Sequence, residues 1–163
     1  MNSLIQRDKS GVFSLAAFSL LFANQKEKGY NMINLGESAK ASFTVQFSDT
    51  ASALSISPED AFPEVFATSR MIALMELAAA RLMRPVLQDG QLSVGVSLNV
   101  KHMAATPVGC KATAVATYLG PEGKLFRFKV EAFDEAGAIG EGEHLRAIIA
   151  TERLLAGAAR RKT

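Results

Sequence analysis

Residues 62–83 read FPEVFATSRMIALMELAAARLM, and this stretch decides the fold. From Ser69 onward the pattern predicts a helix, because Ala, Leu and Met are strong helix formers and the Ser69 hydroxyl suits an N-cap. Pro85 has no backbone N–H to donate, so the helix should end beside it. The predicted helix is apolar over most of its circumference, which is typical of a buried helix rather than a surface one.

One carboxylate interrupts the apolar surface of this helix. At about 100° per residue, Arg70, Arg81 and Arg84 fall within roughly 60° of one another and mark a narrow solvent-facing edge. Glu76 lies about 80–140° from them, on the flank of the buried face. A carboxylate there is costly unless it is paired or neutral. From this stretch alone two interpretations stay open: a catalytic carboxylate in a cleft, or a surface glutamate with Arg81 as a weak neighbour.

Length and composition fit one globular domain. The chain has 163 residues and a net charge of +2 with scattered Lys and Arg, so it lacks the basic footprint of a nucleic-acid-binding protein. Cys110 is the sole cysteine, so no disulfide can form within the chain, which suits a cytoplasmic location. His and Cys show no metal-site spacing, and there is no glycine-rich phosphate loop or Gly-x-Ser-x-Gly elbow. We expect neither a metal nor a cofactor.

The chain divides into three parts: an N-terminal extension or leader over 1–31, disordered or helical, a domain over 32–155 and a basic tail over 156–163. Residues 12–23 form an apolar run that resembles a signal-peptide core. The run is too short to span a bilayer comfortably, and Leu21 stands where a cleavage site needs a small residue. A translated leader, with the domain beginning at residue 32, is the third interpretation and the one we favour. We expect no membrane segment.

The remaining pattern is dominated by strands. Residues 41–47 and 92–101 alternate apolar and polar side chains, and 110–132 read as a hairpin around Gly120-Pro-Glu-Gly123. Ile139–Leu154 is predicted as a last long strand. Short turns favour antiparallel pairing, and a lone apolar helix needs a sheet to wrap it. This order predicts an α+β hotdog fold, in which an antiparallel sheet of about five strands wraps a long central helix and an exposed edge pairs across a dimer.

Two histidines and a threonine are the other candidate polar groups. His102 closes a predicted strand, where an imidazole can act as a general base or can simply be solvated. Thr68 stands just before the helix, whose first N–H groups can hold an oxyanion; alone, it is more simply a hydroxyl that satisfies a backbone donor. His144 lies within the charged segment 141–146, which we interpret as a charged strand face, and we expect it to be structural.

Five short motifs, in order, resemble the fluoroacetyl-CoA thioesterase-like hotdog family over roughly residues 35–153. They are Pro63-Glu-Val-Phe-Ala-Thr68, Met71-Ile-Ala-Leu-Met-Glu76, Val94-Gly95, His102-Met-Ala-Ala-Thr-Pro107-Val-Gly109 and Gly142-Glu-His-Leu-Arg146. No one motif is specific, but the combination and its spacing are. The resemblance implies an acyl-CoA thioesterase that converts a short or small acyl-CoA thioester to the free acid and CoA. CoA is then part of the substrate, and a homodimer forms through the sheet edge.

The resemblance also implies a catalytic set. The family's threonine before the helix, glutamate within it and histidine of the following loop fall on Thr68, Glu76 and His102. Glu76 would attack the thioester carbonyl or activate a water, and His102 would orient or deprotonate the nucleophile. One rival interpretation is a non-catalytic acyl-CoA-binding hotdog module that acts as a sensor, and a hotdog dehydratase or hydratase is a third.

Substrate-binding roles are implied for three more positions. Gly95 corresponds to the acyl and thioester end of the pocket, Phe62 to an aromatic that can cover the acyl group, and Arg146 to an arginine of the final strand. Lys101 and Arg146 are candidates to bind the phosphates of CoA. Ser69 departs from the Gly or Pro expected after the threonine. Fluoroacetyl specificity is a rare trait in the family, so we expect a general acyl-CoA thioesterase.

Overall fold

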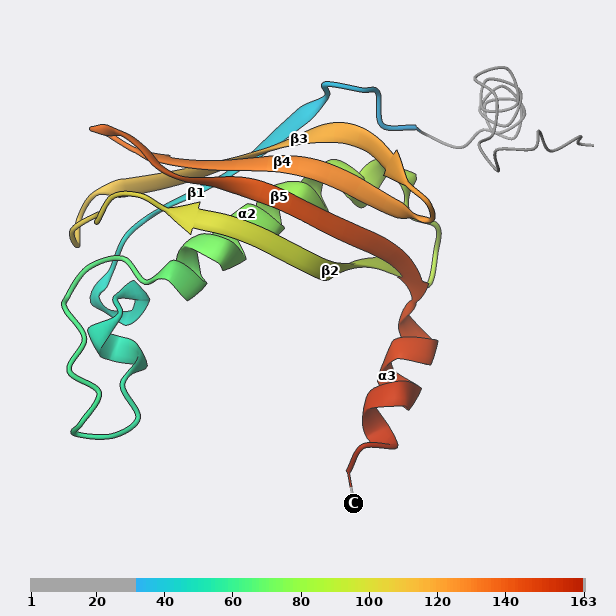
Figure 1. Cartoon of the computed structure of the whole chain (residues 1–163). Coiled ribbons are helices and arrows are strands. Elements are labelled where there is room, and N and C mark those ends of the chain that lie inside the picture. The colour runs from blue at the N-terminus through green and yellow to red at the C-terminus, as the bar shows by residue number, and fades with distance from the viewer. Residues whose placement is uncertain (1–31, 163) are drawn as a thin grey trace, which may run out of the picture. The chain divides into compact units, whose positions relative to one another are not determined.

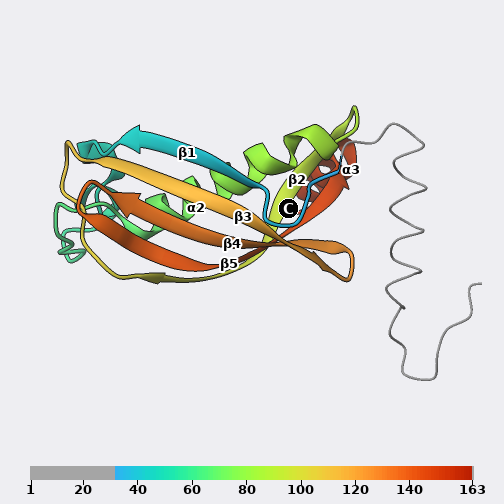
Figure 2. The same ribbon diagram turned by 90° about the horizontal axis from the view of Figure 1, so that it is seen from above.

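The computed structural model describes residues 32–162, so the expectations for 1–31 lie outside the described residues. Five strands form one antiparallel sheet in the order β1-β3-β4-β5-β2. Helix α2 lies along one face of the curled sheet, as Figures 1 and 2 show from two sides. The bounds are β1 Ser38–Thr44, α2 Thr68–Met83, β2 Gln91–His102, β3 Lys111–Glu122, β4 Leu125–Asp134, β5 Gly137–Ala150 and α3 Thr151–Ala159. The predicted α+β architecture is confirmed.

Helix α2 begins one residue before the predicted start. Its N-cap is Ala67, whose methyl group cannot accept a hydrogen bond, so the prediction of Ser69 as the cap is wrong. The helix ends at Met83 and continues as one 3-10 turn, Arg84–Val86, which contains the predicted proline. The arginines of the predicted solvent edge are exposed. The buried helix residues are Met71, Leu74, Met75, Ala78, Ala79, Leu82 and Met83.

The core lies between α2 and the inner face of the sheet. Three successive inward positions of β3 are small, namely Ala112, Ala114 and Ala116, which lets the helix backbone lie close to the strands. Larger side chains from β4, such as Phe128 and Val130, fill the remaining space. Each buried side chain of this size contributes about 1.5–3 kcal/mol, so the apolar helix surface fixes α2 against the sheet.

The strands differ from the sequence pattern in three places. Strand β3 continues through Gly120 to Glu122 and the turn into β4 lies at Gly123 and Lys124, so the predicted turn over 120–123 is wrong for its first three residues. Strand β1 stops at Thr44, and Phe47, predicted as a strand residue facing inward, begins a 3-10 turn and is exposed. Strand β5 ends at Ala150 rather than Leu154, because the Leu- and Ala-rich residues that follow form helix α3. Residues 156–159, assigned to the basic tail, are therefore helical. No helix between residues 32 and 162 is long and apolar enough to cross a bilayer.

Candidate active site

The start of α2 is held by the segment that precedes it. The Ala67 N–H donates to the carbonyl oxygen of Asp49, at 2.9 Å. The Asp49 carboxylate is buried and accepts from Nε of Arg70, in the first turn of the helix, at 2.8 Å. These contacts anchor the residue that precedes the helix and its first turn, and they give Thr68 a defined position at the first helical residue.

Thr68 and His102 meet at this end of the helix. Thr68 Oγ1 lies 2.8 Å from His102 Nδ1, and a backbone hydrogen bond from Phe66 to Thr106 holds the loop after β2 beside the helix. The second ring nitrogen, His102 Nε2, is buried and has no hydrogen-bond partner in the described part of the chain. Because Ala67 offers no side-chain cap, the first N–H groups of α2 can bind developing negative charge here.

A β-bulge lets strand β2 reach both ends of the candidate site. Its pairing with β5 is regular up to Gly95, opposite Arg146, and resumes at Ser97, so Val96 is left unpaired. Directly paired residues share one face of a sheet, and an extra residue moves the following positions to the other face. Odd-numbered positions face α2 before the bulge and even-numbered positions face it afterwards. Gly95 and His102 consequently both face the helix.

Glu76 lies against the earlier part of this strand. A Cβ at Gly95 would stand closer than 3.0 Å to Glu76 Oε1 and 3.1 Å from His144 Cε1, so the bare glycine makes room for the carboxylate. Glu76 Oε1 is 3.5 Å from Arg146 Nη1 and 3.8 Å from His144 Nε2. The Glu76 side chain is 39% exposed. The carboxylate is therefore paired on one side and open to a ligand on the other, as its position on the helix flank predicts.

His144 and Arg146 face the core, so the prediction of a charged strand face is wrong for them. They are buried, whereas Glu141 and Glu143, whose side chains point to the opposite face of the strand, are exposed. Burial lowers the pKa of His144, and the nearby Arg146 charge adds to this while the Ser97 carbonyl opposes it. Burial also lowers the pKa of the Arg146 guanidinium. A buried guanidinium does not fit the expected role of binding CoA phosphates. The sequence contained a signal for this arrangement, because residues 144 and 146 alternate with the glutamates and successive side chains of a strand point to opposite faces.

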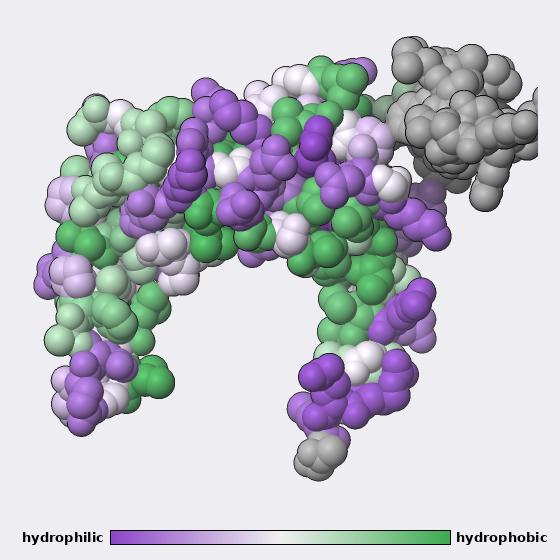
Figure 3. Space-filling model, in the orientation of Figure 1, coloured by the Kyte–Doolittle hydropathy of each residue, from purple (hydrophilic) through white to green (hydrophobic). Residues whose placement is uncertain are grey.

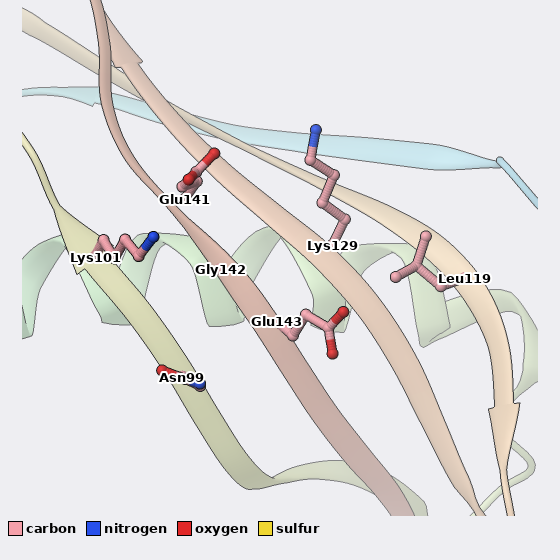
Figure 4. Close-up of a pocket in the computed structure, with 7 residues that line it drawn as sticks. All are labelled: Asn99, Lys101, Leu119, Lys129, Glu141, Gly142 and Glu143. Atoms are coloured by element: carbon pink, nitrogen blue, oxygen red, sulfur yellow. The ribbon is translucent and has the colours of Figure 1, made fainter.

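Phe62 and Lys101 lie apart from these groups. Phe62 is 55% exposed and belongs to the segment that precedes α2. Lys101 belongs to the outer face of the sheet, where it lines a hollow of about 420 Å³ with Lys129, Glu141 and Glu143. Figure 4 shows these side chains on the face away from α2. Because charges of both signs alternate around the hollow, it presents no strong net charge to a ligand.

Within one chain the predicted catalytic set forms two groups. Thr68 contacts His102, whereas Glu76 contacts Arg146 and lies beside Gly95. Eight residues of one helix separate Thr68 from Glu76, which is about 12 Å along the axis. The first group can bind an oxyanion and move a proton, and the second offers a nucleophile or a base.

Solved structures with this architecture define the class of protein. A structure of the fluoroacetyl-CoA thioesterase FlK matches with a TM-score of 0.78 and 38% identity, covering 82% of this chain and 100% of that one. A thioesterase superfamily member from Thermus thermophilus matches with a TM-score of 0.72 and 27% identity, covering 81% of this chain and 95% of that one. The protein is a thioester hydrolase of the hotdog class, as the sequence predicts.

Sequence comparison narrows the class to a family. A sequence model of the fluoroacetyl-CoA-specific thioesterases matches residues 45–152. The fluoroacetyl-CoA thioesterase of Streptantibioticus cattleyicolor is 46% identical over 98 residues, which are 60% of this chain and 70% of that protein. The chain belongs to the fluoroacetyl-CoA-specific thioesterase family. The resemblance stated from the motifs is confirmed, and catalysis is favoured over a non-catalytic binding module.

Proposed function

We propose that this protein hydrolyses a short or small acyl-CoA thioester to the free acid and CoA. Relatives named for fluoroacetyl-CoA support a small acyl group on CoA as the class of substrate. The observation that carries the proposal is the 2.8 Å contact between Thr68 Oγ1 and His102 Nδ1 beside an uncapped helix N-terminus. Such a site can stabilise the oxyanion that forms when a thioester carbonyl is attacked.

The proposed chemistry uses three side chains and water. The thioester carbonyl lies over the start of α2, where Thr68 and backbone N–H groups polarise it. In one route the Glu76 carboxylate attacks the carbonyl carbon, the C–S bond breaks, and water hydrolyses the resulting mixed anhydride. In the other, Glu76 takes a proton from a water that attacks directly. In both, His102 orients the nucleophile and delivers a proton to the departing CoA thiolate.

A homodimer formed through β2 would join the two groups of the site. Strand β2 is an edge of the sheet, it is 12 residues long, and Val96 on it is 53% exposed. A long uncovered edge favours pairing with another chain. Antiparallel pairing of two β2 strands about a two-fold axis near the strand centre would bring His102 of one copy opposite Gly95 of the other. Glu76 lies beside Gly95, so a composite site follows.

The surface around this edge is compatible with a second copy. In Figure 3 the molecule is hollowed between the loop before α2 and helix α3, and β2 borders this hollow. Helix α3 has no buried residue, and its Leu155 is 62% exposed. Apolar side chains left open in this way around an edge strand support burial against a partner.

The activity is tested by following CoA release from acetyl-CoA and a series of longer acyl-CoAs with a thiol reagent. Wild type should turn over a short thioester, and Glu76→Gln should lose at least about 100-fold in kcat, because it removes the nucleophile or base. Equally slow CoA release by both proteins would overturn the enzymatic assignment. Single-turnover hydrolysis in ¹⁸O-labelled water tests the covalent route, because ¹⁸O enters the Glu76 side chain only when an anhydride forms and water attacks its Glu76 carbonyl carbon.

Subunit mixing tests the composite site. Glu76→Gln and His102→Ala homodimers should both be inactive. A heterodimer of the two would keep one site with both residues intact, so mixing should restore about a quarter of wild-type activity at full exchange. If each chain held a complete site, the heterodimer would have none intact and mixing would restore nothing. Sedimentation of wild type should give the mass of a dimer.

The remaining assignments are also proposals. Phe62 would cover the acyl group when substrate is bound, so Phe62→Ala should change the preference among acyl chains. A cytoplasmic location is supported by the lone Cys110, because a chain without disulfides suits a reducing compartment. Fractionation of cells that express the full chain would test it.

A further inference from the structure

His144 is a buried titratable side chain that the proposed mechanism does not use. Its Nδ1 lies 2.9 Å from the carbonyl oxygen of Ser97, at the bulge, and its Nε2 lies 2.9 Å from Nη1 of Arg146. A carbonyl oxygen can only accept and a guanidinium can only donate. The neighbours therefore require one tautomer, with the proton on Nδ1 and a free lone pair on Nε2. The ring is neutral and fully occupied at both nitrogens.

Arg146 is held at both edges of its guanidinium group. Nη2 donates to the carbonyl oxygen of Ser93 at 2.8 Å, and Nε donates to Ser93 Oγ at 3.2 Å. On the other edge Nη1 donates to His144 and lies 3.5 Å from Glu76 Oε1. With Ser93 and His144 in place the plane of the group cannot turn. Nη1 therefore stays beside Glu76, where it donates to the main-chain carbonyl oxygen at 3.5 Å and lies 3.5 Å from the carboxylate oxygen Oε1.

We propose that His144 is a positioning residue whose Nε2 lone pair fixes the Arg146 guanidinium, which in turn holds the Glu76 carboxylate in its working orientation. The inference rests on the proposed function, in which Glu76 is the reacting carboxylate. His144 does not act on Glu76 directly: the 3.8 Å between Nε2 and Oε1 joins two acceptors with no proton between them. Its effect passes through Arg146.

The surroundings of His144 separate this role from simple packing. The charged groups facing the ring are Glu76 from α2 and Arg146 from β5, while β2 contributes the Ser97 carbonyl and β4 the ring of Phe128, at 6.5 Å between centroids. Protonation of His144 would remove the acceptor and set a second cation beside Arg146. The positioning role should therefore fail at acid pH, and a packing role should not.

Three variants of His144 test the proposal through CoA release and thermal denaturation. His144→Gln keeps an oxygen acceptor near the position of Nε2. His144→Asn keeps the donor toward Ser97 but is one methylene too short to accept from Arg146, and His144→Leu keeps only volume. We expect His144→Gln to lose less than about threefold in kcat, and the other two to lose about 10- to 100-fold with little change in KM, since a carboxylate misplaced by about 1 Å costs this much. Because Gln does not titrate, the acid limb of its kcat profile should also move to lower pH.

Two results would overturn the inference. One is a folded His144→Asn protein with wild-type kcat, and the other is a loss of kcat that follows the melting temperature in all three variants. If His144→Asn does not fold, identical acid limbs for wild type and His144→Gln overturn it instead. Glu76→Gln separates the two levels of the argument: wild-type activity in that variant would refute the proposed function, whereas an inactive Glu76→Gln with unaffected His144 variants would refute the positioning role alone.

Discussion

Gly95→Ala should disable the site without unfolding the protein. The added Cβ would lie closer than 3.0 Å to Glu76 Oε1, 3.5 Å from Glu76 Cδ and 3.1 Å from His144 Cε1. Ordinary contacts are about 3.5 Å or longer, so something must retreat by about 1 Å. The His144 ring is fixed by hydrogen bonds at both nitrogens, whereas the Glu76 side chain is flexible and partly exposed. We therefore expect the carboxylate to move.

A displacement of about 1 Å at a reacting group can lower the rate about 100-fold, equivalent to about 2.7 kcal/mol in the barrier. Stability should fall by only about 1 kcal/mol, the lower end for overpacking, because a flexible side chain yields. The measurements are kcat/KM for CoA release and urea denaturation. Gly157→Ala is a matched control, since a Cβ there meets nothing nearer than 4.0 Å. If Gly95→Ala keeps kcat/KM within about threefold of wild type, Gly95 does not set the carboxylate position.

Three further outcomes are expected. Thr68→Val keeps the shape of the side chain but removes the hydroxyl bonded to His102, so kcat should fall about tenfold, the equivalent of one hydrogen bond of about 1.4 kcal/mol, while Thr68→Ser keeps most activity. Asp49→Ala removes the buried partner of Arg70, and urea denaturation should show a loss of about 1–2 kcal/mol in the free energy of unfolding. The loss should be near the low end because Arg70 is half exposed. An unchanged urea midpoint would argue against a stabilising ion pair. Since burial lowers the pKa of His144 from 6.5, the unfolded chain binds more protons than the folded one below about pH 6.5. The stability that neutral His144 contributes is complete above that pH and is lost as the pH falls toward the lowered pKa of the folded protein. Wild type should therefore lose more stability than His144→Gln on acidification. Parallel losses in the two proteins would contradict this.

The helix and its carboxylate were predictable because they depend on local chemistry. Helix propensity and angular position place Glu76 on the flank of the buried face. The hairpin was predictable from its glycines, although only Gly123 lies in the turn and Gly120 lies at a bulge in β3. The helix start was not predictable from propensity alone. A hydroxyl at Ser69 is the better cap by chemistry, but the tertiary hydrogen bond from the Ala67 N–H to the Asp49 carbonyl oxygen anchors the chain so that the helix begins at Thr68 without a side-chain cap.

The inward-facing part of the site was hidden by two features of the strands. His144 stands next to exposed glutamates in the sequence, and only the two-residue alternation of β5 separates it from them. The five apolar residues of 92–101 suggest one continuous face, yet the bulge places Leu92 and Val94 on the side opposite Leu98 and Val100. Gly95 within the strand was the available signal, because an isolated glycine in a strand often marks a bulge.

Val96 matters to this enzyme because it adds one residue to strand β2, and not because of the chemistry of its side chain. Gly95 and His102 are an odd interval apart, and in a regular strand such residues look away from each other. The extra residue at the bulge, Val96, brings Gly95 and His102 to the same face of the sheet. Many side chains can replace Val96, but a one-codon deletion would turn the imidazole out of the cleft while every functional residue stayed in the gene. The spacing along this strand is therefore as much a part of the proposed catalytic site as the side chains that the strand carries.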